Sequence, residues 1–156
     1  MIEQQFIESI GKLIDRDLNK LAEEIRQYPT EEGIWVVKGD IKNSAGNLCL
    51  HLCGNLQHFF GAVLGKTGYV RNRENEFAAK GIPKTQLLAE IQNTRDAVSK
   101  TLENFNPSLL ATKYPEKVFE YPLTHLLFFT HLSVHLGYHL GQINYHRRLT
   151  SPTNTG

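Results

Sequence analysis

The spacing of apolar residues constrains the fold of this chain more than any other feature. Over residues 2–27, apolar side chains recur at intervals of three and four: Phe6, Ile10, Leu13, Ile14, Leu18, Leu21 and Ile25. This spacing places them on one face of an α-helix. Similar patterns predict three more helices, over residues 44–64, 83–105 and 123–149. Because each helix must bury its apolar face, we expect an all-α fold, an antiparallel four-helix bundle.

The segments between the predicted helices are long. Residues 28–43 include a short run rich in β-forming residues, Ile34 to Val37, followed by turn residues. Residues 65–82 are mostly polar, and we expect both segments to be connections that cross between helices. The length of 156 residues suits one domain. We expect residues 1–150 to form this domain and residues 151–156 to be a disordered tail.

Composition argues against several classes of protein. The net charge of +1 does not indicate the clustered basic face of a nucleic-acid-binding protein. The apolar runs are shorter than a membrane span, and the acidic, amphipathic start is unlike a signal peptide. Cys49 and Cys53 lie four residues apart on a predicted helix, where we expect them to stay reduced and to fill the core. We therefore expect a cytoplasmic protein with a small-molecule substrate, and neither a nucleic acid nor a membrane as partner.

Histidines recur every four residues in the last predicted helix, at His131, His135 and His139. Residues at i and i+4 lie on one helix face about 6 Å apart, so two neighbouring imidazoles can bind one metal ion. All three span about 12 Å along the helix axis, so we expect one end histidine to lie outside the site. His51, on the second predicted helix, can supply a third ligand. Three protein ligands with one open position are typical of a catalytic metal site.

Other polar residues near these histidines have two interpretations. Gln142 shares the face of His139, and Asn55 shares that of His51, so each either orients an imidazole or only packs between helices. Whether His58 or His131 also joins the site is left open by the spacing.

Further polar groups are expected away from the site. We expect His125 and His146, near the helix ends, at the surface. The segment Arg71–Phe77 either forms an ordered, salt-bridged loop or binds an acidic substrate. No carboxylate falls on the faces that carry the three predicted ligands. Imidazole ligands suit Zn, Ni, Cu or Fe.

Three motifs in this chain resemble those of the DinB/YfiT-like superfamily. The sequence HLGYHLGQI, from His135 to Ile143, resembles the H-x-x-x-H-x-G-Q-[IVL] signature of that superfamily's last helix. The pattern L-x-x-H-L-x-x-N-L, from Leu48 to Leu56, resembles its helix with the first metal histidine. Residues 71–77 resemble the R-x-R-x-x-E-F element of a subgroup. The resemblance covers nearly the whole chain.

The resemblance implies a four-helix bundle in which His51, His135 and His139 bind Zn or Ni, often in a homodimer. Characterised members include thiol-S-transferases and a thiol-dependent isomerase, which use low-molecular-weight thiols. Leu140 departs from the family, because many members have Arg or Lys after the last histidine. This departure argues against an anionic ligand contact at that position.

These observations favour a metal-dependent enzyme, most simply a thiol-dependent S-transferase that acts on a small electrophile. Three neutral ligands leave the charge of a divalent ion uncompensated, which favours an anionic fourth ligand such as a thiolate. The lack of a carboxylate base on the ligand faces also favours thiol chemistry slightly. The alternatives are a metal-dependent hydrolase and a non-catalytic bundle that binds a metal or another ligand.

Overall fold

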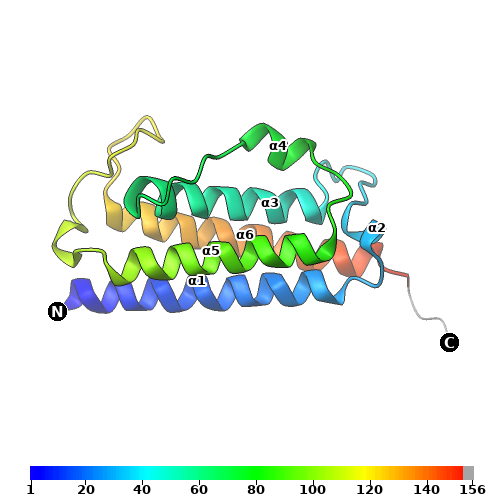
Figure 1. Cartoon of the computed structure of the whole chain (residues 1–156), viewed down its shortest axis with the longest axis horizontal. Helices are drawn as coiled ribbons and strands as arrows, with labels where there is room; N and C mark the ends of the chain where they lie inside the picture. The colour runs from blue at the N-terminus through cyan, green and yellow to red at the C-terminus, as the bar shows by residue number, and fades with distance from the viewer. Residues whose placement is uncertain (153–156) are drawn as a thin grey trace.

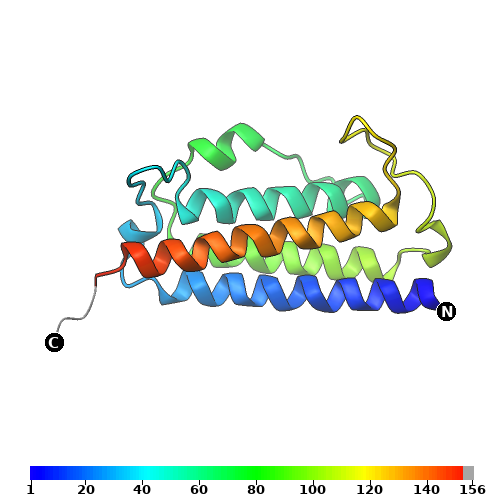
Figure 2. The same cartoon turned by 180° about the vertical axis from the view of Figure 1, so that it is seen from behind.

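The computed structural model describes residues 1–152 and consists mainly of four long helical segments (Figures 1 and 2). They are α1 (Ile2–Gln27), α3 (Ala45–Leu56) continued by the π-helical η1 (Gln57–Leu64), α5 (Lys84–Glu103) and α6 (His125–Thr150). Within residues 1–152 no β-sheet forms; the only β-type pairing is an isolated bridge between Lys113 and Thr124. The predicted all-α bundle is therefore confirmed. The expected tail lies outside the described residues from residue 153 onward.

The long helices run in two directions. α1 and α6 run one way along the bundle, and α3 and α5 run the other way (Figure 1). Each of α1 and α3 packs against both α5 and α6. α3 and α5 are consecutive long helices but run parallel, because residues 65–83 return along the length of the bundle before α5 begins (Figure 1). The length of this connection is therefore a requirement of the topology.

Side-chain caps define where two of the long helices begin. Ser44 Oγ accepts a hydrogen bond from Asn47 N at 3.1 Å, which caps α3 as its sequence indicates. Thr124 Oγ1 accepts from Leu127 N at 3.2 Å and caps α6. α1 ends at Tyr28, which is extended because the following Pro29 disfavours helical backbone before it. The predicted and observed bounds of the four long helices agree closely.

The connections contain short helices that periodicity did not reveal. They are α2 (Glu31–Ile34), α4 (Arg73–Ala78) and the 3-10 turn η2 (Pro107–Leu109). The run of β-forming residues from Ile34 to Val37 forms no strand, because Ile34 ends α2 and the segment is a connection, as expected. Asn72 Oδ1 accepts a hydrogen bond from Asn75 N at 3.0 Å and caps α4. Elements of one or two turns are too short to show a repeating apolar pattern, so capping is their main sequence signal.

The core lies where the four long helices meet. Its fully buried side chains include Leu18, Leu21, Leu52, Phe129 and Leu136. Both cysteines are buried and free, as expected of core residues. No helix among the described residues is both long and apolar enough to cross a membrane.

Truncation of a core leucine should destabilise the bundle. Leu52 on α3 is 0% exposed, so Leu52→Ala leaves a cavity and should lower the free energy of unfolding by about 2–5 kcal/mol. Val134 on α6 is 66% exposed, and Val134→Ala should change this free energy by at most about 0.5 kcal/mol. Urea denaturation measures both. Equal losses in the two variants would contradict the placement of Leu52 in the core.

Candidate metal centre

Three histidines from two facing helices converge at one point. His51 lies on α3, and His135 and His139 lie on α6. One ring nitrogen of each lies within 4.8 Å of those of the other two. The Nε2 atoms of His51 and His135 are 3.2 Å apart. Two nitrogens bound tetrahedrally to one Zn²⁺ lie about 3.3–3.4 Å apart, given Zn–N bonds of about 2.0–2.1 Å. This predicted triad can therefore hold one divalent ion with little rearrangement.

Two of the three imidazoles have a partner at Nδ1. His51 Nδ1 lies 3.1 Å from Oε1 of Glu76, and His139 Nδ1 lies 2.6 Å from Oε1 of Gln142. A neutral imidazole that donates from Nδ1 presents its lone pair at Nε2, which suits metal binding. Gln142 thus occupies the orienting position that its spacing indicated. The Nδ1 atom of His135 is buried and has no hydrogen-bond partner among residues 1–152.

The surroundings of His135 and His139 keep these two imidazoles uncharged. Burial, which has the largest effect, and the neighbouring His139 and His51 together lower the pKa of His135 to about 4. Burial is also the largest cause that lowers the pKa of His139. Neutral imidazoles have the free lone pairs that a metal ion requires. The geometry and the protonation state therefore both suit a cation.

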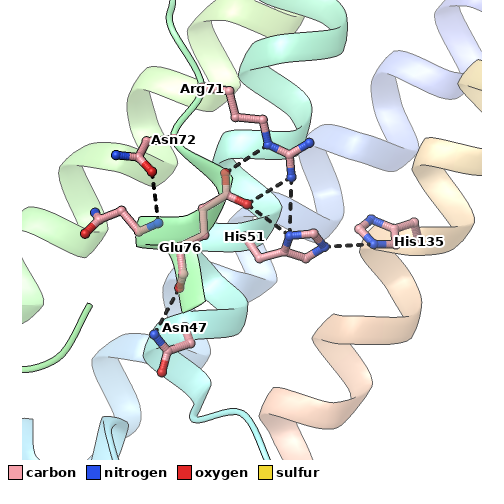
Figure 3. A network of polar contacts seen from close by, with 7 residues as sticks. Asn47, His51, Arg71, Asn72, Glu76 and His135 are labelled. Atoms are coloured by element: carbon pink, nitrogen blue, oxygen red, sulfur yellow. Dashed lines mark hydrogen bonds and ion pairs between the residues drawn. The ribbon is translucent and has the colours of Figure 1, made fainter. Parts of the chain in front are cut away.

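Glu76 and Arg71 lie at this site, whereas the sequence indicated only an ordered, salt-bridged loop or a substrate-binding segment for them. Glu76 does not lie on a helix face that carries a ligand; it comes from α4, where it is 5% exposed and contacts His51 (Figure 3). Arg71 donates from Nε to Oε2 and from Nη2 to Oε1, each at 2.9 Å. Burial alone would raise the pKa of Glu76, but its contacts with His51 and Arg71 outweigh burial and lower it. The motif at Arg71–Phe77 was the only sequence signal for this contact, and it did not indicate that the segment packs against His51.

Three other predicted neighbours do not join the triad. Asn55 is buried, but its Oδ1 has no hydrogen-bond partner among the described residues. His58 Nε2 lies 3.1 Å from a carboxylate oxygen of Glu116. The ring of His131 stacks near that of His135, with centroids 6.1 Å apart, outside the triad.

Two histidines expected at the surface are buried instead. The ring of His125 lies 3.0 Å from the carbonyl oxygen of Thr112. His146 lies between the Tyr28 hydroxyl, at 2.6 Å from Nδ1, and the Val36 carbonyl, at 2.8 Å from Nε2. The connections fold over the helix ends and cover both rings. These histidines tie the connections to α6 and lie apart from the triad.

A pocket of about 540 Å³ lies beside the triad. It lies between the second half of α6 and the first turn of α3. Leu48, Tyr138, His139, Gln142 and Tyr145 line it, together with residues 40–43. Apolar walls with a few polar groups are typical of small-molecule sites.

The metal-free protein should lose stability between about pH 6.5 and pH 4. Because the folded pKa of His135 is about 4, against an unfolded value of about 6.5, the unfolded state binds more protons in this range. Stability therefore falls as the pH falls through this window. Urea denaturation at several pH values should show a smaller slope for His135→Ala than for the wild type. Identical slopes would mean that this imidazole is not held neutral.

Comparison with known proteins supports the fold and identifies the family. No curated protein has a matching sequence. A crystal structure of a conserved protein from Enterococcus faecalis is similar, with a TM-score of 0.73 and 18% identity over 92% of this chain and 95% of that one. At this identity the likeness shows the fold alone. Residues 2–154 match the sequence model of a family described as "Protein of unknown function (DUF1572)". Because the match spans nearly the whole chain, the protein belongs to the DUF1572 family.

Proposed function

We propose that this protein is a metal-dependent enzyme of the DinB/YfiT-like type, with Zn or Ni bound by His51, His135 and His139. The observation that carries the proposal is the convergence of three ring nitrogens within 4.8 Å from two facing helices. No fourth histidine, cysteine or carboxylate of residues 1–152 belongs to this group. A site with three protein ligands leaves a position for substrate, which structural sites do not.

The reaction that these residues support best is thiol transfer to a small electrophile. A divalent ion at the site would lower the pKa of a bound low-molecular-weight thiol and so supply a thiolate nucleophile. The chain's own thiols are unsuited to this role. The hydrogen bond that the Cys49 thiol donates to Cys53 and burial both raise the pKa of Cys49, and both cysteines are buried in the core. The reacting thiol must therefore come from a cosubstrate.

Hydrolysis is the second candidate, because Glu76 places a carboxylate next to the triad. A hydrolytic site needs a general base that can reach the attacking water. Both oxygens of Glu76 already accept hydrogen bonds from Arg71, and Oε1 also contacts Nδ1 of His51. This carboxylate is therefore engaged on the side of His51 away from Nε2. Because Glu76 is held by these contacts, thiol transfer is favoured over hydrolysis. A non-catalytic metal-binding bundle is the third candidate.

We propose that the protein acts in the cytoplasm, because this compartment holds the reduced thiols that the reaction requires. A homodimer follows from the family resemblance, and the exposed apolar side chains Val134, Tyr138, Tyr145 and Leu149 of α6 offer a surface for it.

Removal of one predicted ligand should abolish metal binding. After loading with Zn²⁺ and dialysis, the wild type should retain one ion per chain, and His135→Ala should retain none. His58→Ala is the matched control, because His58 pairs with Glu116 outside the triad. His125 is a poorer control, because it is buried. Elemental analysis measures the metal, and circular dichroism checks that each variant is folded. Equal metal content in wild type and His135→Ala would refute the assignment.

The metal-loaded protein should catalyse thioether formation. Each of glutathione, bacillithiol, mycothiol and coenzyme A is offered with 1-chloro-2,4-dinitrobenzene, which gives a coloured thioether, chloride and a proton. At least one thiol should react faster with wild type than with His135→Ala. If the loaded wild type neither binds nor consumes any of the four thiols, thiol transfer is excluded and the hydrolase takes its place.

A further inference from the structure

The connection between α3 and α5 packs against the Nδ1 side of the His51 ring. Asn47 Nδ2 donates to the carbonyl oxygens of Glu76 and Ala79 at 2.9 and 2.8 Å, which ties α4 to α3. The ring of Phe77 lies against that of His51, with centroids 4.9 Å apart. This short helix is therefore fixed at the triad on the side opposite α6, as Figure 3 shows.

The contacts of Glu76 determine which ring nitrogen of His51 carries the proton. Arg71 binds both carboxylate oxygens, so Glu76 is held as a carboxylate that can only accept hydrogen bonds. His51 Nδ1 is 3.1 Å from this carboxylate and 3.4 Å from Nη2 of Arg71. The shorter contact is to the anion, so Nδ1 is the protonated nitrogen. The lone pair of His51 is then at Nε2, which faces His135.

Gly54 makes room for this carboxylate. It lies three residues after His51 on α3, and a Cβ atom added there would lie 1.9 Å from Oε2 of Glu76. A side chain at this position would overlap the carboxylate, so the contact between Glu76 and His51 requires glycine at position 54. Glycine inside a helix is otherwise unfavourable by about 1 kcal/mol relative to alanine.

We propose that Gly54, Arg71 and Glu76 act together as a positioning unit that fixes the tautomer and orientation of His51. Glu76 is the positioning residue, Arg71 holds its carboxylate in place, and Gly54 admits it. Through His51, the unit sets the affinity of the triad for a divalent cation. This inference rests on the metal site of the proposed function. It assigns a role to the Arg71–Phe77 segment, and Gln142 serves His139 in the same way.

Two variants test the unit by different routes. Gly54→Ala keeps every polar group but displaces the carboxylate of Glu76, and Glu76→Gln removes its charge. Each should weaken Zn²⁺ binding about 10- to 100-fold, the usual effect when a group that orients a metal ligand is lost. Competition with a chromophoric chelator measures the affinity. Glu116→Gln is the matched control, because it breaks a second histidine–carboxylate pair, with His58, outside the triad.

A second measurement separates positioning from folding. In the metal-free wild type, ¹⁵N NMR of the histidine rings should show His51 in the Nδ1–H form, whereas both variants should also populate the Nε2–H form. A purely structural role would change unfolding but not the tautomer. Urea denaturation records stability in parallel, and Gly54→Ala should remain folded because alanine favours the helix.

The two proposals fail in different ways. If the wild type binds no Zn²⁺, the metal site is wrong, and the NMR result still tests whether Glu76 fixes the tautomer of His51. If the wild type binds Zn²⁺ and both variants bind it equally well, the positioning unit is overturned while the metal site stands. An Nε2–H form of His51 in the metal-free wild type would also overturn it.

Discussion

The packing of α3 against α6 is the contact on which both the fold and the site depend. Leu52 of α3 and Leu136 of α6 are fully buried, and the two helices pack against each other. That arrangement brings His51 opposite His135 and His139. A slip of one helical turn would move one helix by about 5.4 Å along the other, too far for the ring nitrogens to share an ion. The hydrophobic contacts therefore fix the geometry of the polar cluster.

Burial of this polar cluster costs free energy, and that cost indicates a functional site. His135 is held neutral, and its Nδ1 has no partner among the described residues. The Arg71–Glu76 ion pair is also largely buried, an arrangement that seldom adds net stability. Groups that contribute little to stability but converge on one point are typical of functional sites. A bound cation would give the imidazole lone pairs a partner.

The connection between α3 and α5 serves the topology and the site together. Its length allows α3 and α5 to run parallel, since the chain must return along the bundle between them (Figure 1). On its way it forms α4, which carries Glu76 to His51. A short turn in its place would reverse the direction of α5 and would leave no chain beside His51. The site is therefore built from α3, from α6 and from the segment that links α3 to α5.

The sequence by itself determined the four long helices and the three converging histidines. The helices and the shared face of His135 and His139 follow from local periodicity, because intervals of three and four define a helix face whatever surrounds it. The choice of His51 and His139 as ligands came from the resemblance to a known superfamily. Only the tertiary structure decided which other groups reach the site. Glu76 lies 25 residues from His51, on a helix too short for a periodic pattern, and His125 and His146 are buried by connections that fold over them. Such contacts depend on where long connections pass in space, and local spacing carries no information about that path.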